Sequence, residues 1–152
     1  MLFDRWRPRD INLEVAVSGE SGNLTFYTEG GLSSVFNTTS LEQARKYHEA
    51  GSIKHLKELK VPCLPLSTIL QRHLLDGQKL SFFSIDAEGN DITVLRSNDW
   101  NQYRPELVLA ETHTSSLEKL IADELVELMR KNEYHVRSWI APTLIFARNE
   151  QQ

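Results

Sequence analysis

The sequence predicts an α/β domain whose sheet has a mostly parallel centre and antiparallel hairpins at its N- and C-terminal ends. Two short apolar runs, residues 80–85 and 107–110, have the length and composition of strands buried in a parallel sheet. The link between them contains a helical segment and is long enough for a crossover connection. Segments of alternating hydrophobicity near both ends of the chain are typical of hairpins.

The first alternating segment predicts an N-terminal β-hairpin. Residues 11–18 alternate, with Leu13, Val15 and Val17 on one face. Residues 19–22, Gly-Glu-Ser-Gly, have turn chemistry, and residues 23–28 alternate again. The hydroxyl-rich stretch that follows, up to Thr39, is expected to be a loop that contains Gly30 and Gly31.

A helix and an interrupted strand are expected next. Ser40 and Gln43 form a capping-box pattern, and Gly51 is placed to end the helix that they begin. The extended segment 59–64 contains Pro62, which favours a position at a sheet edge or at a bulge.

Two further helices and a second hairpin complete the expected elements. Ser67 is placed to cap a helix that runs to Leu75 and ends at Asp76-Gly77. Ser115 and Glu118 form a capping box at the start of one amphipathic helix, which ends near Asn132 and has an apolar face of Leu117, Leu120, Ile121, Leu125 and Leu128. Segments 134–139 and 143–147 are expected to be strands on either side of a turn at Ala141-Pro142.

Composition limits the class of protein. The 152 residues, of which 40% are hydrophobic and 25% charged, fit a single globular domain at 11–152 after a flexible lead at 1–10. The net charge of -4 and the scattered basic residues argue against a nucleic-acid partner. Cys63, the single cysteine, is expected to be a buried small side chain, because one thiol forms no internal disulfide. Since no membrane span or signal peptide is evident, we expect no membrane partner and a reduced, cytoplasmic location.

Acidic residues follow both apolar runs. Asp86 and Glu88 come after the first run, and Glu111 and His113 come after the second. In open α/β sheets, ligands bind beyond the carboxyl ends of the strands, and neighbouring strands lie about 5 Å apart. These carboxylates are therefore expected to converge on one ligand, where they could orient a hydroxyl, hold an ammonium group or chelate a hard divalent ion. His113 is a candidate general base.

The same residues also have structural interpretations. Acids at strand ends often cap the next helix, a role open to Asn90 and Asp91. Glu111 can pair with an arginine, either Arg96 or Arg104, and a histidine at the position of His113 is often only a solvated loop residue. The spacing alone leaves both interpretations open.

Residues 84–95, Ser-Ile-Asp-Ala-Glu-Gly-Asn-Asp-Ile-Thr-Val-Leu, resemble the signature of FkbM-type S-adenosylmethionine-dependent methyltransferases. That signature is an apolar strand ending in Ile-Asp-x-Glu-Gly, followed by an acidic position and a Val-Leu pair. Other segments are similar to the family in the same order: the hairpin at 13–26, the serine-bearing loop at Ser33-Ser34, the segment from Leu66, the strand at 107–113 ending in Glu-x-His, the helix from Leu117 and the strand from Tyr134.

The resemblance implies a class I methyltransferase fold, which is Rossmann-like, and methyl transfer from S-adenosylmethionine to an oxygen of a sugar or small metabolite. It places Asp86 and Glu88 near the methionine part of the cofactor or near the acceptor, with Gly89 in the same cofactor-binding turn. Glu111 and His113 would build the acceptor side. Ala16 and Val17, at the end of a strand, would approach the adenine.

The chain departs from the family pattern in three places. Ser67-Thr68 stands where the family has an aspartate-rich step, and Asn132-Glu133 stands where the family has a glycine before Tyr134. Nothing before Ile11 corresponds to the first strand with its glycine-rich turn, or to the second strand with its ribose-binding acid. Gly19, Gly22, Gly30 and Gly31 are turn glycines, not a dinucleotide fingerprint.

These departures leave three functional interpretations. The first is a methyltransferase domain, and the second is a non-catalytic interaction or oligomerisation module derived from such an enzyme. The third is a divalent-metal site for hydrolysis at Asp86, Glu88 and Glu111. Without the family's first strand, the strand at 80–85 is expected to have a bare edge. Either the N-terminal hairpin pairs with that edge, or a second copy or a partner chain covers it.

Overall fold

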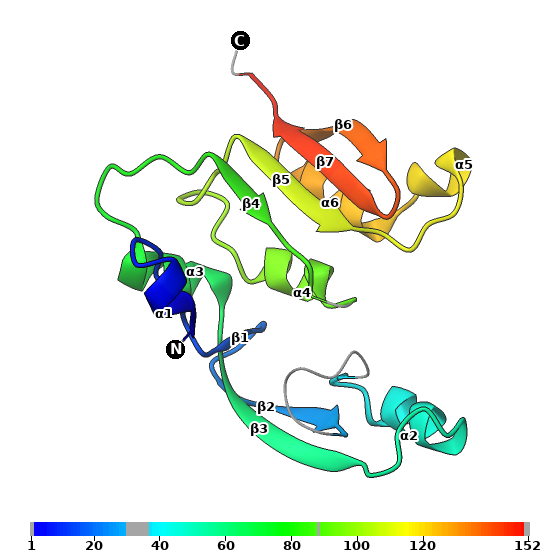
Figure 1. Ribbon diagram of the computed structural model, residues 1–152. Coiled ribbons are helices and arrows are strands. Elements are labelled where there is room, and N and C mark those ends of the chain that lie inside the picture. The colour runs from blue at the N-terminus through cyan, green and yellow to red at the C-terminus, as the bar shows by residue number, and fades with distance from the viewer. Residues whose placement is uncertain (1, 30–36, 88, 151–152) are drawn as a thin grey trace. The chain divides into compact units, whose positions relative to one another are not determined.

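The computed structural model describes residues 2–29, 37–87 and 89–150 (Figure 1). They belong to two compact units, Met1–Leu64 and Pro65–Gln152. The mixed α/β class predicted from the sequence is confirmed. Of the five strand pairings among the described residues, however, only β1–β3 and β4–β5 are parallel, so the expected mostly parallel centre is not what these strands form. No helix in the described part of the chain is long and apolar enough to cross a membrane.

Unit 1 contains a three-stranded sheet. Its elements are α1 (Leu2–Trp6), β1 (Ala16–Val17), β2 (Gly22–Thr28), α2 (Leu41–Glu49) and β3 (Lys57–Leu64). The strand order is β1-β3-β2, with β3 parallel to β1 and antiparallel to β2. The predicted hairpin is therefore wrong, because β3 lies between the two strands that were expected to pair. The alternating pattern identified β2, whereas only Ala16–Val17 of the expected strand at 11–18 form a strand. The pattern contains no information about which strand lies beside which.

Pro62 lies within the central strand of this sheet and not at an edge or a bulge. The physical reason is the shortness of β1, which pairs only with Cys63 and Leu64. The carbonyl of Leu64 accepts a hydrogen bond from Ser18 N–H, so the backbone groups of Leu64 face β1. Because the backbone groups of alternate residues face the same side of a strand, the nitrogen of Pro62 also faces the β1 side, beyond the end of β1. The missing N–H of proline therefore removes no ladder hydrogen bond.

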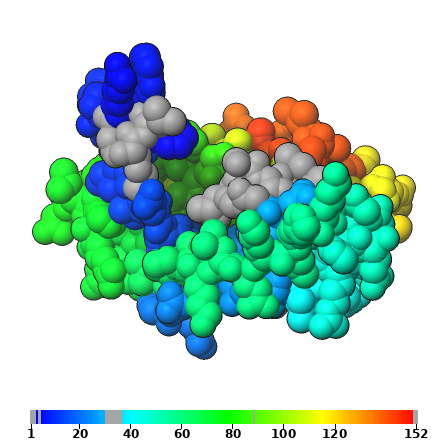
Figure 2. All heavy atoms as spheres, turned by 60° about the horizontal axis from the view of Figure 1, so that its bottom comes forward, coloured from blue at the N-terminus to red at the C-terminus, as the bar shows by residue number. Residues whose placement is uncertain are grey.

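The predicted helix after Ser40 is confirmed as α2. The Ser40 side chain accepts from the Gln43 N–H at 3.2 Å, and Gly51 has a φ of 71° just beyond the helix. Ala44 and Ile53 are buried and anchor this region. The space-filling view shows α2, in cyan, at the surface of its unit (Figure 2). The Gly30-Gly31 and Ser33-Ser34 positions of the adjoining loop lie outside the described residues.

Unit 2 contains a four-stranded mixed sheet with helices packed on it. The helices are α3 (Leu66–His73), α4 (Asp91–Arg96), α5 (Leu117–Leu120) and α6 (Glu124–Lys131). The strands are β4 (Phe82–Ser84), β5 (Leu107–Glu111), β6 (Tyr134–Ile140) and β7 (Thr143–Arg148), in the order β4-β5-β7-β6. Helix α6 lies across one face of the sheet (Figure 1), and its residues Leu125, Val126 and Met129 join the core with Val108 and Phe146.

The two apolar runs do form adjacent parallel strands, as predicted. Only β5 is central, however, because β4 is the edge strand, with Phe82 and Ser84 exposed and Phe83 buried. Among the described residues β4 pairs with β5 alone, and the strands of unit 1 form a sheet of their own.

The predicted amphipathic helix is two helices. Ser116, and not Ser115, caps α5 by accepting from Lys119 N–H, and Asp123 interrupts the pattern by capping α6 through Leu125 N–H at 2.9 Å. Leu120 and Leu125 are buried, whereas Leu117 and Ile121 are exposed. The helix end near Asn132 and the antiparallel strand pair β6–β7 are confirmed.

The predicted helix at 67–75 is present as α3, but it begins at Leu66, ends at His73 and has a different cap. Ser67 makes no side-chain cap, and the N-cap position is Pro65. Instead, Ser97 accepts two hydrogen bonds from the first turn of the helix, at its Oγ from Leu66 N–H (2.9 Å) and at its carbonyl from Ser67 N–H (3.1 Å). The cap is therefore supplied from a distant part of the sequence.

Candidate functional site

The ends of β4 and β5 lie at the same rim of the sheet. The two strands are parallel, with Ser84 in register with Leu109, and Ile85 N–H donates to the Leu109 carbonyl at 2.9 Å. Asp86 and Glu111 each come two residues after these partners, so they occupy equivalent positions on neighbouring strands. Neighbouring strands are about 5 Å apart, which brings the two acids to one rim.

Asp91 joins the turn after β4 to the end of β5. The residue is 3% exposed, and its two carboxylate oxygens accept from different backbone groups: Oδ2 from Ala87 N–H at 3.3 Å and Oδ1 from Glu111 N–H at 3.1 Å. A buried carboxylate is costly unless it is hydrogen-bonded, and here both oxygens have partners. Asp91 therefore fixes the turn that carries Asp86 against the strand end that carries Glu111.

Gly89 and His113 also meet at this rim. Gly89 has a φ of 88°, in the left-handed region that favours glycine. A Cβ added to Gly89 would lie 3.8 Å from His113 Nε2, which shows that the backbone of the turn lies against the imidazole. His113 is otherwise exposed.

Hydrogen bonds to Pro142 and Asp123 fix the segment from Glu111 to Thr114. Thr112 is 5% exposed, and its N–H donates to the Pro142 carbonyl at 2.9 Å. The hydroxyls of Thr112 and Thr114 both donate to Asp123 Oδ2, at 2.6 and 2.9 Å. With the threonines anchored in this way, the half-buried Glu111 and the exposed His113 keep their side chains available at the rim.

The ion pair of Glu111 and the cap at Asn90, which were the structural interpretations of these residues, are not what the structure has. Arg96 pairs with Glu124 at 2.5 Å and Arg104 pairs with Glu133 at 2.9 Å, so neither arginine pairs with Glu111. Asn90 occupies the N-cap position of α4 without a side-chain cap bond. Sequence analysis did not identify Asp123 as a capping and anchoring residue, because it lies within a segment whose pattern predicts one continuous helix.

The remaining predicted residues are distributed as follows. Glu88 lies outside the described residues. Ala16 and Val17 lie half-buried in β1 of unit 1, where they pair with Cys63 and Leu64. Their predicted approach to adenine stays a prediction. Within the described part of the chain, no three His, Cys, Asp or Glu side chains are grouped to hold a metal ion.

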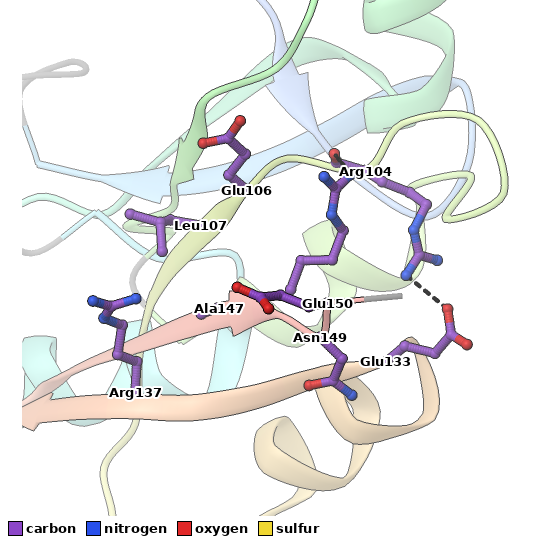
Figure 3. Close-up of a pocket in the computed structure, with 9 residues that line it drawn as sticks. Arg104, Glu106, Leu107, Glu133, Arg137, Ala147, Asn149 and Glu150 are labelled. Atoms are coloured by element: carbon purple, nitrogen blue, oxygen red, sulfur yellow. Dashed lines mark hydrogen bonds and ion pairs between the residues drawn. The ribbon is translucent and has the colours of Figure 1, made fainter. Parts of the chain in front are cut away.

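A cavity of about 950 Å³ lies at the opposite rim, where β5 begins and β7 ends (Figure 3). Its charged lining consists of three arginines and three glutamates: Arg104, Arg137, Arg148, Glu106, Glu133 and Glu150. Arg104 is already engaged, because it donates to Glu133 and to the carbonyls of Trp100 and Asn132. These charges balance, and none of the predicted site residues lines the cavity, so we place the candidate site at the rim of Asp86 and Glu111.

The chain is an α/β protein whose candidate ligand site lies at the carboxyl ends of two adjacent parallel strands, where such sites are usual. Residues 5–136 match the family described as the methyltransferase FkbM domain. Because the match spans most of the chain, the protein belongs to the FkbM methyltransferase family. Neither the curated proteins nor the solved structures contain a match to it.

Proposed function

We propose that this chain takes part in methyl transfer from S-adenosylmethionine to an oxygen of a sugar or small metabolite, in the reduced setting of the cytoplasm. Family membership supports the reaction class. The observation that supports the proposal most directly is the position of Asp86, Glu111 and His113 at the ends of two adjacent parallel strands. We further propose that the strands of unit 2 are part of a class I methyltransferase sheet.

The residues present suit the hydrogen-bonding groups of the cofactor. The methionine part of S-adenosylmethionine has an ammonium group and the ribose has hydroxyls, all of which donate hydrogen bonds. Carboxylates accept only, and Asp86 and Glu111 supply two of them at one rim. Asp86 is exposed, and no hydrogen bond or ion pair of its carboxylate is found among the described residues. It therefore has free acceptor capacity for an ammonium group.

The chemistry at the acceptor side requires positioning and a base. When bound, the cofactor supplies an electrophilic methyl group. His113 would accept the proton of the acceptor hydroxyl at Nε2 as the oxygen–methyl bond forms, and Glu111 would orient that hydroxyl by accepting its hydrogen bond. Gly89, with no side chain, leaves room beside the imidazole for the acceptor.

Calorimetry with S-adenosylhomocysteine tests the cofactor assignment. Asp86→Ala is expected to weaken binding roughly 10- to 100-fold, because a hydrogen bond to a charged group contributes about 1.5–3 kcal/mol. Asp76→Ala is the matched control, since Asp76 is an exposed aspartate in the turn after α3. If the unmodified protein shows no binding, or if both variants bind as it does, the assignment of Asp86 is wrong.

Transfer of a labelled methyl group to a panel of sugars and small hydroxylated metabolites tests the base. His113→Gln is expected to lower turnover by about 10²- to 10⁴-fold, the usual contribution of a general base, while binding of S-adenosylhomocysteine stays unchanged. A loss of cofactor binding without a separate loss of turnover would place His113 on the cofactor side instead.

The non-catalytic alternative has one observation in its favour, which is the exposed edge of β4. It predicts association without affinity for S-adenosylhomocysteine, so the same calorimetry distinguishes it from the enzyme. The hydrolytic metal site needs Glu88, which lies outside the described residues, and no observation favours it.

A further inference from the structure

His113 lies at the centre of a turn that its two neighbours close. Thr112 Oγ1 accepts from Thr114 N–H at 3.2 Å, a hydrogen bond that spans His113 and is typical of turns built on serine or threonine. Thr112 is buried, and its own N–H donates to the Pro142 carbonyl at 2.9 Å. The backbone of His113 is therefore fixed on both sides.

The direction of the Thr112 hydroxyl is set by Asp123. A hydroxyl has one proton to donate and two lone pairs that accept. Thr112 donates its proton to Asp123 Oδ2 at 2.6 Å, which leaves a lone pair for the N–H of Thr114. The hydroxyl of Thr114 donates to the same carboxylate oxygen at 2.9 Å. One oxygen of Asp123 thus holds the residues on both sides of His113.

Asp123 is itself fixed to the core of unit 2. Its Oδ1 accepts from Leu125 N–H at 2.9 Å and so caps α6, whose residues Leu125 and Met129 are buried. A residue needed only as a helix cap would use this one oxygen, and serine or asparagine would serve as well. The second oxygen is what the carboxylate adds, and both of its hydrogen bonds go to the neighbours of His113.

We propose that Asp123 is a positioning residue for the transfer reaction and acts on His113 through the two threonines. By holding them, it keeps the imidazole beside the turn at Gly89, where a Cβ added to the glycine would lie 3.8 Å from Nε2. A general base works only within hydrogen-bond reach of the proton that it accepts, so displacement of the imidazole lowers the rate. The consequence for methyl transfer rests on the proposed function, whereas the position of the imidazole does not.

Nuclear Overhauser effects test the position of the imidazole without any substrate. The unmodified protein should show a contact between the ring protons of His113 and the Hα protons of Gly89. Asp123→Asn keeps an oxygen for the α6 cap, because asparagine ranks with aspartate at that position, but it puts an NH₂ donor beside two hydroxyl donors. The contact should weaken several-fold in this variant. Ser116→Ala, which removes the cap of α5, is the control and should keep the contact.

Two results of this experiment would overturn the proposal. One is the absence of the contact in the unmodified protein, and the other is a contact of full strength in Asp123→Asn.

A matched pair of substitutions at Thr112 tests the same link from its other end. Thr112→Ser keeps the hydroxyl, whereas Thr112→Val keeps the branched shape and removes it. The contact between His113 and Gly89 should persist in Thr112→Ser and weaken in Thr112→Val. This pair decides the question if Asp123→Asn does not fold, and an undiminished contact in Thr112→Val would show that the threonine does not transmit the effect of Asp123.

Steady-state kinetics of labelled methyl transfer test the consequence for the reaction. Asp123→Asn and Thr112→Val should lower kcat by roughly 10- to 100-fold, because a misplacement of about 1 Å can cost about 10²-fold in rate. Their Kd for S-adenosylhomocysteine should stay unchanged, and Thr112→Ser and Ser116→Ala should keep the kcat of the unmodified protein. An unchanged kcat in Asp123→Asn and Thr112→Val would contradict the role in transfer. If the unmodified protein transfers no methyl group, the proposed function fails, and the contact between His113 and Gly89 alone decides whether Asp123 positions the imidazole.

Discussion

Replacing Asp91 should both destabilise unit 2 and release the turn after β4. The residue is 3% exposed, and its carboxylate accepts from Ala87 N–H and Glu111 N–H. Asp91→Asn keeps the shape but retains one acceptor oxygen, so its amide NH₂ must face a backbone donor. Because a hydrogen bond to a charged group contributes about 1.5–3 kcal/mol, we expect a loss of about 2 kcal/mol in the free energy of unfolding. Asp91→Ala leaves both buried N–H groups without the carboxylate and should cost about 3 kcal/mol.

Urea unfolding followed by circular dichroism measures this loss. The midpoint should move to lower urea for both Asp91 variants, while the slope with denaturant stays unchanged, because the area exposed on unfolding is the same. Asp76→Asn, at an exposed aspartate, should leave the midpoint within about 0.5 kcal/mol of the unmodified protein.

Amide exchange locates the effect within the fold. The Ala87 and Glu111 amides should exchange faster in both Asp91 variants, whereas amides of the β6–β7 pair should not lose protection beyond the global change in stability. If Asp91→Asn were as stable as the unmodified protein and these two amides kept their protection, the role of Asp91 as a link between the two strand ends would be refuted.

Three further substitutions test other parts of the fold. Glu133 has a φ of 66°, so Glu133→Gly should be more stable than Glu133→Ala by about 1 kcal/mol in thermal or urea unfolding, since both lose the ion pair with Arg104 and only glycine relieves the left-handed strain. Equal stabilities would show that the strain is absent. Burial raises the pKa of Tyr134, whose hydroxyl donates to the Pro105 carbonyl at 2.6 Å. The folded state therefore prefers the protonated phenol, and the resulting stability is fully present below the ordinary value of 10.0 and is lost as pH rises through the higher folded pKa. Unfolding at alkaline pH should consequently be less pH-dependent in Tyr134→Phe, and an identical pH dependence would contradict the assignment. Ser97→Ala should cost about 1 kcal/mol through loss of the α3 cap, whereas Ser67→Ala should cost less than about 0.5 kcal/mol, and the reverse order would restore Ser67 as the cap.

The elements that sequence predicts well are those whose causes are local. The cap at Ser40 and the stop at Gly51 lie within a few residues of α2, and both are where the pattern placed them. The parallel neighbours β4 and β5 follow from two apolar runs joined by a link that holds a helix. The pattern could not predict contacts between residues that are distant in sequence. The insertion of β3 between β1 and β2 and the capping of α3 by Ser97 both depend on such partners.

The family's glycine position before Tyr134 illustrates how a departure from a motif can keep the conformation. Glycine is favoured where φ is positive, and Glu133 adopts a φ of 66° at that point. The ion pair with Arg104 gives the glutamate a partner, and the same arginine lies 5.7 Å from the ring centroid of Tyr134. The backbone conformation is therefore retained even though the residue that usually favours it is absent.

Hydrogen bonding separates the acids of the candidate site into two roles that their spacing could not distinguish. Asp91 and Asp123 use both carboxylate oxygens on groups of the protein itself, two backbone N–H groups for Asp91, and two hydroxyls and a helix N-terminus for Asp123. An acid whose oxygens are all engaged inside the fold has no capacity left for a ligand. Asp86 is exposed, and among the described residues no hydrogen bond or ion pair to the carboxylate of Asp86 or of Glu111 is found. Asp91, which is buried, and Asp123, which is half-buried, thus hold the rim in place, and the carboxylates of Asp86 and Glu111 are the ones we propose for binding the cofactor or the acceptor.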